Sequence, residues 1–403
     1  MVRFTNQVLF ASVPSVPMMR DRFRVTAAAL ALVSAACGGG DTTDGPEPPA
    51  ADPVVAAAST PAADATAGDG GVADQPASDE SDESGSSAEA PGFDVVTVEP
   101  EPVEPVVFPL TINDAAGREF TFDEPAKLGC VWVGCTEIHA SLGVAPKAAP
   151  VPAGIDDDSV FYFPVGQPDF VPTVLNDFEA WAGADIDTII LRGLPGANDG
   201  VVEQFVDIFY LYMEGVTDEN VTGVDVYREN LRLVGQIIGE PEAAAEATAR
   251  LDTAISTLAA FSTPELAERS FAYVFNEDAY RVMTSEAPFC AAIAEAGLGT
   301  CIERSEGELN AEELLRLDPD VIAYQQGLND VATRDDPTWG RLSAVQDGTA
   351  YDSDDGAYRC CVSRSLIWAL QDFAASAIPD SPIPPPGPLA TFDPTTSPLV
   401  IGD

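Results

Sequence analysis

Basic residues are scarce in this sequence. Of its 403 residues only 19 are Lys or Arg, against 66 Asp or Glu, so the formal net charge is −47. Lysine is limited to Lys127 and Lys147, and histidine to His139. A chain this acidic is repelled by phosphate backbones, which disfavours nucleic-acid binding. The acidity is typical of solubility in a salty habitat, and a site for a cationic ligand is the alternative.

Several motifs of common enzymes and metal receptors are also missing. The sequence has no G-x-S-x-G, no G-x-x-x-x-G-K and no H-E-x-x-H. Receptors for bare zinc or manganese need several His and carboxylate ligands, and one histidine cannot supply them. We therefore expect neither an enzyme nor a bare-metal binder, and no bound cofactor. His139 is expected to be a partly buried helix residue, with an axial ligand to haem or cobalt as the lesser alternative.

The N-terminal residues 1–36 have the features of an export signal. The better start is Met18 or Met19, because three arginines (Arg20, Arg22 and Arg24) then precede a mostly apolar run at 25–33. That run is too short to span a bilayer as a mature helix. Ser-Ala-Ala-Cys37 follows, then three glycines, which resembles the lipobox of bacterial lipoproteins despite a serine where an aliphatic residue is usual. Cys37 is the expected lipid anchor, and an ordinary cleaved signal is the alternative.

Residues 37–108 are predicted to form a disordered tether. From 38 to 108 there are 16 acidic residues and no basic one, and Ala, Pro, Ser and Gly fill most of the rest. Such a composition cannot bury enough apolar surface to fold. A flexible segment of this length reaches roughly 45–50 Å, which would lift a domain clear of a membrane.

Residues 109–222 are predicted to form an N-terminal α/β lobe. The stretch 110–122 alternates apolar and polar residues around a turn, which predicts a hairpin. A strand over 128–133, a helix over 135–143 capped by Thr136, and a buried-type strand over 185–191 follow. Strands that alternate with helices indicate a parallel sheet.

A helical connector and a second lobe are predicted to follow. Residues 223–262 lack strand signals and have helical periodicity interrupted by Gly239 and Pro241. From 263 to 380 the pattern again predicts strands at 270–275 and 320–325 and helices at 287–297 and 310–317. The Pro-rich tail 381–403 is expected to be surface-bound or disordered. The predicted fold class is α/β, with two Rossmann-like lobes, a long backbone helix between them and a ligand cleft.

An internal repeat supports two related lobes. Glu179 stands eight residues before Asp187, and Glu312 stands eight residues before Asp320. In each case a short helix leads into a strand. A negative charge near a helix N-terminus is favourable by itself, so capping alone is one explanation of these glutamates.

The sequence from about 110 to 380 resembles the iron-complex/cobalamin periplasmic-binding family. The similarity is carried in order by TINDAAGREFTF, LGCVWVGCTEIHASLGV, LNDFEAWAGADIDTII, LNAEELLRLDPDVIA and TWGRLSAVQDGTAYDSD. The resemblance implies two lobes joined by one long helix and a monomeric solute-binding subunit of an ABC importer. It also implies that Glu179 and Glu312 dock onto arginines of the membrane permease.

The candidate ligand residues follow strands, because ligands of such folds meet the loops at the carboxyl ends of parallel strands. Arginine suits carboxylate or catecholate oxygens, and aromatic rings supply flat apolar contact.

A ferric siderophore is the expected ligand, with haem or cobalamin next, and a sensor or adhesin on the same fold is the alternative function. For any one arginine, a surface salt bridge is the alternative role. The candidates are Trp132, Phe161, Tyr162, Arg192, Tyr280, Arg281, Tyr324, Tyr358 and Arg359.

The cysteines are expected to form disulfides. With Cys37 assigned to lipid, an even number of six remains in an exported chain. Cys290–Cys301 is the favoured pair because it spans a helix and the next strand of one lobe. The other four are Cys130, Cys135, Cys360 and Cys361; they pair as 130–135 and 360–361, or across the lobes. Metal binding by these cysteines is disfavoured because two spaced C-x-x-C pairs are lacking.

Overall fold

The structure is a computed structural model. It describes residues 93–150, 169–171, 181, 183–196, 199–213, 221, 223–275, 280–282, 287–302, 308–309, 311–325, 337–353 and 363–401. The predicted signal, the lipid anchor Cys37 and most of the predicted tether lie outside these residues. In the part of the chain that is described, none of the helices is both long enough and apolar enough to cross a membrane.

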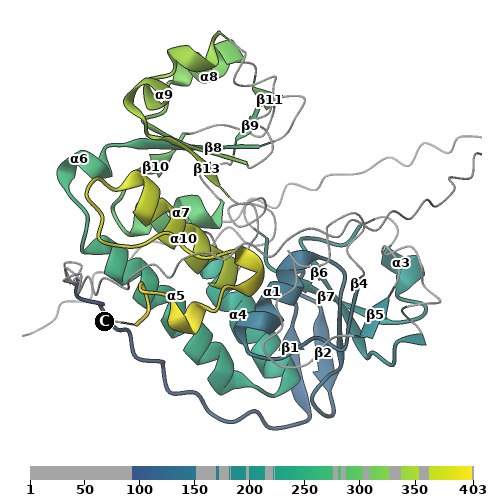
Figure 1. The fold of residues 1–403 in the computed structure, drawn as a ribbon. Coiled ribbons are helices and arrows are strands. Elements are labelled where there is room, and N and C mark those ends of the chain that lie inside the picture. The colour runs from purple at the N-terminus through teal and green to yellow at the C-terminus, as the bar shows by residue number, and fades with distance from the viewer. Residues whose placement is uncertain are drawn as a thin grey trace, which may run out of the picture. The chain divides into compact units, whose positions relative to one another are not determined.

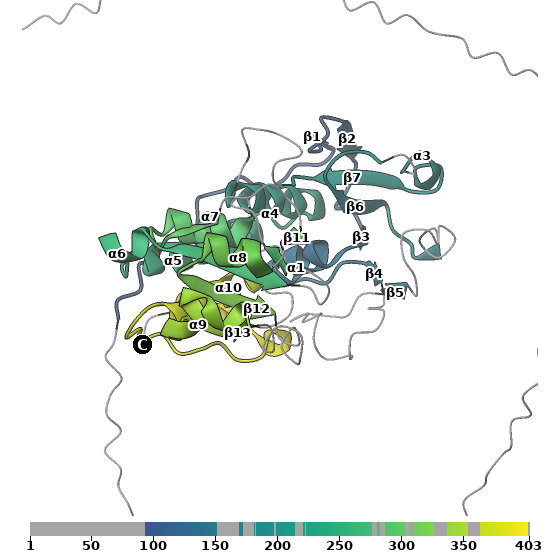
Figure 2. The same ribbon diagram turned by 90° about the horizontal axis from the view of Figure 1, so that it is seen from above.

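The N-terminal half contains a hairpin and a parallel sheet (Figure 1). Strands β1 (Leu110–Asn113) and β2 (Glu119–Phe122) pair antiparallel, which confirms the predicted hairpin. The five-stranded sheet has the order β5-β4-β3-β6-β7 and all its pairs are parallel. Figure 2 shows β6 and β7 on one side of β3, with β4 and β5 on the other. The bounds are β3 Leu128–Cys130, β4 Ala148–Pro150, β5 Asp169–Val171, β6 Thr188–Arg192 and β7 Asp207–Leu211.

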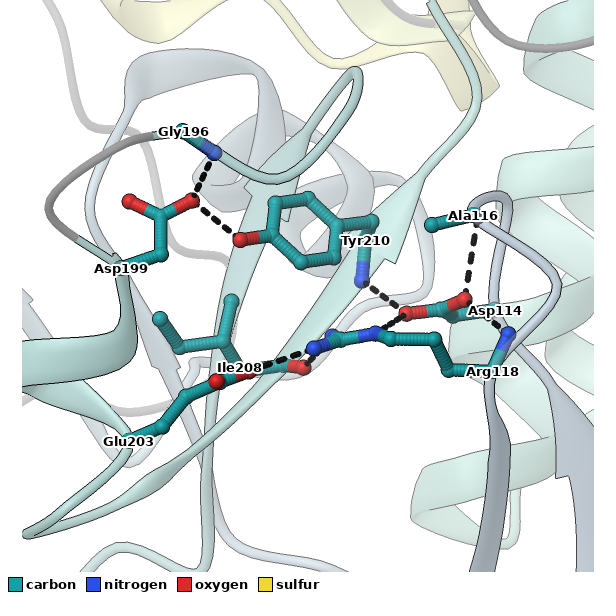
Figure 3. Close-up of polar contacts among 8 residues, drawn as sticks. All are labelled: Asp114, Ala116, Arg118, Gly196, Asp199, Glu203, Ile208 and Tyr210. Carbon is teal, nitrogen blue, oxygen red and sulfur yellow. Dashed lines mark hydrogen bonds and ion pairs between the residues drawn. The ribbon is translucent and has the colours of Figure 1, made fainter. Parts of the chain in front are cut away.

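A polar network fixes the hairpin to the edge strand β7 (Figure 3). The buried Asp114 carboxylate accepts hydrogen bonds from its own turn, including the backbone N–H of Arg118 at 2.8 Å and its Nε at 2.9 Å. The Arg118 guanidinium lies 4.5 Å from the Tyr210 ring centroid and donates to Glu203 and to the Ile208 carbonyl. Because these partners come from three separate segments, the network holds the hairpin, β7 and helix α3 (Asp199–Val202) together.

Helix α1 (Val133–Ser141) begins earlier than the sequence predicts. Trp132 is its N-cap in extended conformation, so Thr136 is a buried residue inside the helix and not its cap. Gly143, the last residue of the predicted helix, has φ +74° just past the end of α1, a conformation that glycine commonly adopts where a helix ends. The preceding strand is correspondingly short, because the chain leaves the sheet after Cys130 to start the helix.

The predicted connector is an antiparallel pair of helices, α4 (Asp225–Ile238) and α5 (Pro241–Ala259). Gly239 adopts φ +79° between them, and Pro241 occupies the first turn of α5. The N-terminal half of α5 packs into the core of the first sheet, and its C-terminal half packs into the core of the second. The long backbone helix is therefore α5, and α4 is an additional helix that packs against it, as shown by the approach of Gly235 to Ala244.

The C-terminal half is built on a mixed sheet. Its order is β11-β9-β8-β12-β13, with β10 also paired to β8. Phe271 and Tyr273 of β8 face the core that contains α7 and α10, whereas Ala272 and Val274 face the core beside α8 and α9. Figure 1 shows these helices on opposite faces of the sheet. The strands are β8 Ser270–Phe275, β9 Tyr280–Val282, β10 Thr300–Cys301, β11 Glu308–Leu309, β12 Val321–Gln325 and β13 Ala350–Ser353. The helices are α6 Pro264–Ala267, α7 Pro288–Glu295, α8 Ala311–Leu317, α9 Ser343–Asp347 and α10 Ser363–Ala377, with 3-10 turns at Trp339–Arg341, Leu389–Thr391 and Pro394–Thr396.

Two terminal segments are better packed than the sequence predicts. The tether was expected to reach residue 108, but Phe93 contacts Phe261, and the backbone N–H of Val98 donates to Thr253 Oγ1 of α5 at 2.9 Å. The C-terminal tail is surface-bound and not disordered: Ile383, Phe392 and Leu399 are buried in the core formed with α10. In the tail, single apolar residues between prolines make the contact with the core. Because they do not form a regular helix or strand there, the sequence shows no periodic pattern that would predict this packing.

Candidate functional site

Two of the predicted ligand residues meet at the carboxyl ends of neighbouring strands. Trp132 follows β3 by two residues, and Arg192 is the last residue of β6. These strands pair in parallel, so both residues reach the same edge of the sheet. The Arg192 guanidinium carbon lies 5.0 Å from the centroid of the Trp132 ring, within the range of a cation–π contact. Arg192 itself is exposed, so it is open to solvent beside the indole.

Glycine makes room for this pair. A Cβ on Gly134 would lie 1.5 Å from the Trp132 ring, so the indole can pack across the start of α1 only because that position has no side chain. Gly193, directly after Arg192, has φ +89°, a conformation that favours glycine. The Trp132 Nε1 is buried and has no hydrogen-bond partner among the described residues. The sequence placed Trp132 and Arg192 at strand ends but gave no sign that they would stack.

The loop that carries Trp132 is closed by a disulfide. Cys130 and Cys135 are both fully buried, and their Cα atoms are 5.4 Å apart. The second disulfide joins Cys290 of α7 to Cys301 of β10. Cys290–Cys301 is the pairing favoured from the sequence, and Cys130–Cys135 is one of the two alternatives that the sequence left open. Cys360 and Cys361 lie outside the described residues.

The C-terminal half contributes less to the described part of the site. Tyr324 in β12 is half-buried, and its ring packs edge-on against Trp339 with a centroid distance of 5.7 Å. This ring therefore belongs to the packing beside α8 and α9. Tyr280 and Arg281 lie in β9, where Arg281 pairs with Phe275 and Glu308, but only their backbone is described. Four further candidates lie outside the described residues: Phe161, Tyr162, Tyr358 and Arg359.

The repeat in the sequence corresponds to an equivalent backbone feature in the two sheets. Asp187 accepts a hydrogen bond from the backbone N–H of Lys127 at 2.8 Å, and Asp320 accepts one from the N–H of Ser270 at 2.8 Å. Each aspartate thus anchors the beginning of a neighbouring strand. Two residues earlier, Asp185 and Asp318 both adopt positive φ, at 54° and 41°. The sequence pattern that marks this shared feature is Asp-x-Asp, at Asp185–Asp187 and Asp318–Asp320. The repeat described from the sequence alone covers only the distance from each glutamate to the second aspartate.

The docking candidates are only partly described. Glu312 is exposed in the first turn of α8, where its charge is also favourable to the helix. Glu179 lies outside the described residues. The exposure of Glu312 is compatible with both interpretations, namely docking to a permease and capping of a helix.

His139 is more buried than expected, with 2% of its surface exposed. Burial lowers the pKa of its imidazole to about 3, so the ring is neutral at ordinary pH. It lies within 4.8 Å of the sulfurs of Cys130 and Cys135, in the interior and not at the exposed strand edge that carries Arg192.

A buried ion pair joins the two halves and was not foreseen. Arg364 of α10 donates to Glu137 of α1 at 2.7 Å, and their side chains are only 1% and 4% exposed. The same guanidinium donates to the carbonyls of Phe392 at 3.0 Å and of Leu389. The two residues are 227 positions apart in the chain, and neither stands in a pattern that would indicate a partner.

Comparisons with known proteins identify the fold. Neither a family model nor a curated protein matches the sequence. Among solved structures, the triscatecholate siderophore-binding protein FeuA from Bacillus subtilis, in complex with ferri-bacillibactin, matches with a TM-score of 0.55 and 14% identity, over 66% of this chain and 98% of that chain. The siderophore-binding protein FhuD from Vibrio cholerae, bound to Fe3+-Desferal, matches with a TM-score of 0.54 and 14% identity, over 65% and 100%. A periplasmic binding protein from Veillonella parvula has a TM-score of 0.54 and 13% identity, over 71% and 98%. The predicted two-lobed α/β fold is confirmed.

Proposed function

We propose that this chain, which has the fold of siderophore-binding proteins, is an extracytoplasmic lipoprotein that captures a chelated metal for an ABC permease. A ferric siderophore is the proposed ligand, with haem or cobalamin next. The observation that carries the proposal is the stacked pair of Trp132 and Arg192 at the carboxyl ends of β3 and β6. That edge of a parallel sheet is where ligands of such folds bind.

The chemistry of this pair favours an anionic, aromatic or carboxylate chelate. The guanidinium offers planar, paired donors to catecholate or carboxylate oxygens, and the indole face offers an apolar surface. The chain has a net charge of −47, so an exposed arginine at this edge places a positive charge on a mostly acidic protein. An anionic ligand would be attracted to that charge. Two of the solved structures with this fold are described as complexes of ferric siderophores.

A sensor or adhesin on the same fold is the second candidate. It would use the same pair of residues for binding but would need no permease. Uptake of the bound chelate separates the two functions, because only the transport protein moves its ligand into the cell.

Replacing Arg192 with alanine is expected to weaken binding of a ferric siderophore about tenfold to a hundredfold, because a charge-assisted hydrogen bond contributes roughly 1.5–3 kcal/mol. Binding is measured by titration with a ferric catecholate and with a ferric hydroxamate while following tryptophan fluorescence. Arg232→Ala is the matched control, because Arg232 is exposed on α4 and pairs with Glu229 there. If the wild type and Arg192→Ala have equal affinities for every chelate that binds, Arg192 does not contact the ligand.

Cys37 is expected to carry the lipid. A fatty-acid analogue fed to the native host should label the wild-type protein, and Cys37→Ala should not be labelled and should leave the membrane fraction. Labelling of Cys37→Ala, or no labelling of the wild type, would contradict the anchor.

The double variant Glu179→Arg with Glu312→Arg is expected to abolish uptake while ligand affinity hardly changes. Like charges facing permease arginines cost several kcal/mol in docking, which is on the order of a hundredfold or more. Uptake of labelled chelate is measured in cells, and affinity is measured on the purified variant. The neighbouring Glu313→Arg serves as a control for added charge on α8. Normal uptake by the double variant would show that neither glutamate is needed for docking to a permease, and would leave stabilisation of a helix end as their role.

A further inference from the structure

Three side chains that can bind a metal meet where β3 runs into α1. Cys130 ends the strand, and Cys135 and His139 lie one turn apart in the helix, on the same face. One ligand atom of each residue lies within 4.8 Å of the other two. The two cysteines are 0% exposed and His139 is 2% exposed. The cluster is therefore enclosed by protein.

The imidazole of His139 has no structural partner in this cluster. Both of its ring nitrogens are buried without a hydrogen bond to any described residue. A buried polar group without a partner reduces stability, so its presence points to an interaction that the protein alone does not supply. This observation is independent of the two cysteines.

The disulfide determines whether the cluster can bind a metal, because the thiolate and not the disulfide is the ligand. A dithiol reductant transfers two electrons and two protons to the Cys130–Cys135 bond, leaves as its own disulfide, and generates two thiols. A divalent ion then displaces the two thiol protons and is held by two thiolates and one neutral imidazole. The resulting centre has no net charge, which suits a buried position.

The geometry fits a small thiophilic ion. Metal–sulfur and metal–nitrogen distances of about 2.3 and 2.0 Å place tetrahedral ligands roughly 3.5 Å apart, within the span of this cluster. His139 also lines a pocket of about 290 Å³ together with Lys127, Lys147 and Glu240. Neither cysteine lines this pocket and both ring nitrogens of His139 are buried, so the pocket lies beside the cluster.

We propose that Cys130, Cys135 and His139 form a redox-controlled site for a thiophilic divalent cation such as Zn²⁺. The site is closed while the disulfide is present and opens when a dithiol reduces it. In the oxidised protein His139 stays unpaired beside the disulfide, and in the reduced protein it becomes the third ligand.

Cobalt titration of the purified full chain tests this site. The chain is reduced without oxygen by a trialkylphosphine, which becomes its oxide with oxygen from water and adds no competing thiol. Reduced wild type should bind one Co²⁺ with thiolate-to-cobalt charge-transfer absorption, and Zn²⁺ should displace it. The oxidised protein should show no such absorption. Cys130→Ser with Cys135→Ser should abolish the signal, and His139→Ala should weaken binding at least tenfold and shift the visible cobalt bands.

The second disulfide supplies the matched control. Cys290→Ser with Cys301→Ser removes the other buried pair, which has no histidine beside it, and this variant should bind like the wild type. No charge-transfer band in reduced wild type, an unchanged band in the Cys130→Ser, Cys135→Ser protein, or unchanged affinity in His139→Ala would overturn the proposal. Near-ultraviolet circular dichroism checks folding. If the serine pair does not fold, His139→Ala, which keeps both disulfides, and the reduced wild type decide the result.

Discussion

Replacing Arg364 with alanine is expected to destabilise the protein by about 3–5 kcal/mol, the cost of leaving one member of a buried ion pair alone. Arg364 and Glu137 are almost fully enclosed, and the guanidinium also satisfies two carbonyls of the C-terminal tail. Its loss therefore leaves the buried Glu137 carboxylate without its charged partner and removes a donor from the Phe392 carbonyl, whereas the Leu389 carbonyl keeps the N–H of Phe392. Urea unfolding followed by far-ultraviolet circular dichroism measures the change, which is a large fraction of the roughly 5–15 kcal/mol that stabilises a typical domain.

Two controls separate the pair from a general effect of losing arginine. Arg232→Ala removes an exposed arginine that pairs with Glu229, and it should cost less than about 1 kcal/mol. Arg364→Met combined with Glu137→Leu should recover much of the loss, because an apolar pair of similar volume leaves no buried charge. An Arg364→Ala protein as stable as Arg232→Ala would show that water reaches Glu137 and replaces the pair.

Local patterns predicted some of the described elements but missed others, among them β7, β13 and α10. The alternation of 110–122, the β-branched run in β6 and the helical period of α4 depend on neighbours in sequence, and each element formed where its pattern stands. Glycine and proline at 239 and 241 also divided α4 from α5 as predicted. These signals succeed because hydrophobic periodicity and turn chemistry act over a few residues.

Long-range features could not be predicted in the same way. The Glu137–Arg364 pair and the packing of Phe392 against α10 join segments that only the folded chain brings together. The predicted cap of α1 was wrong: Thr136 has the chemistry of an N-cap, but β3 ends at Cys130 and the helix already begins at Val133. Trp132 and Arg192 were predicted as strand-end residues, but their stacking depends on Gly134, which has no side chain to displace the indole.

The stability of the oxidised protein is expected to fall by about 2 kcal/mol between pH 7 and pH 5 because of one residue, His139. In the unfolded chain its pKa is about 6.5, whereas burial lowers the pKa to about 3 in the folded protein. Between these values only the unfolded chain takes up the proton, so acid favours unfolding. The stabilisation is complete above pH 6.5 and is lost as the pH falls towards 3.

Because His139 is the only histidine, a variant at this one position removes the whole imidazole contribution to this interval of pH. His139→Leu keeps a side chain of similar size and cannot titrate. Urea unfolding of both proteins at pH 7, 6 and 5 should give curves that diverge by about 2 kcal/mol at pH 5, with the variant the more stable. Burial also raises the pKa of the nearby Glu137 carboxyl, but this residue is present in both proteins, so its contribution cancels in the difference. Parallel stability curves for the two proteins would mean that the folded protein already admits a proton to His139, and that its imidazole is hydrated and not enclosed.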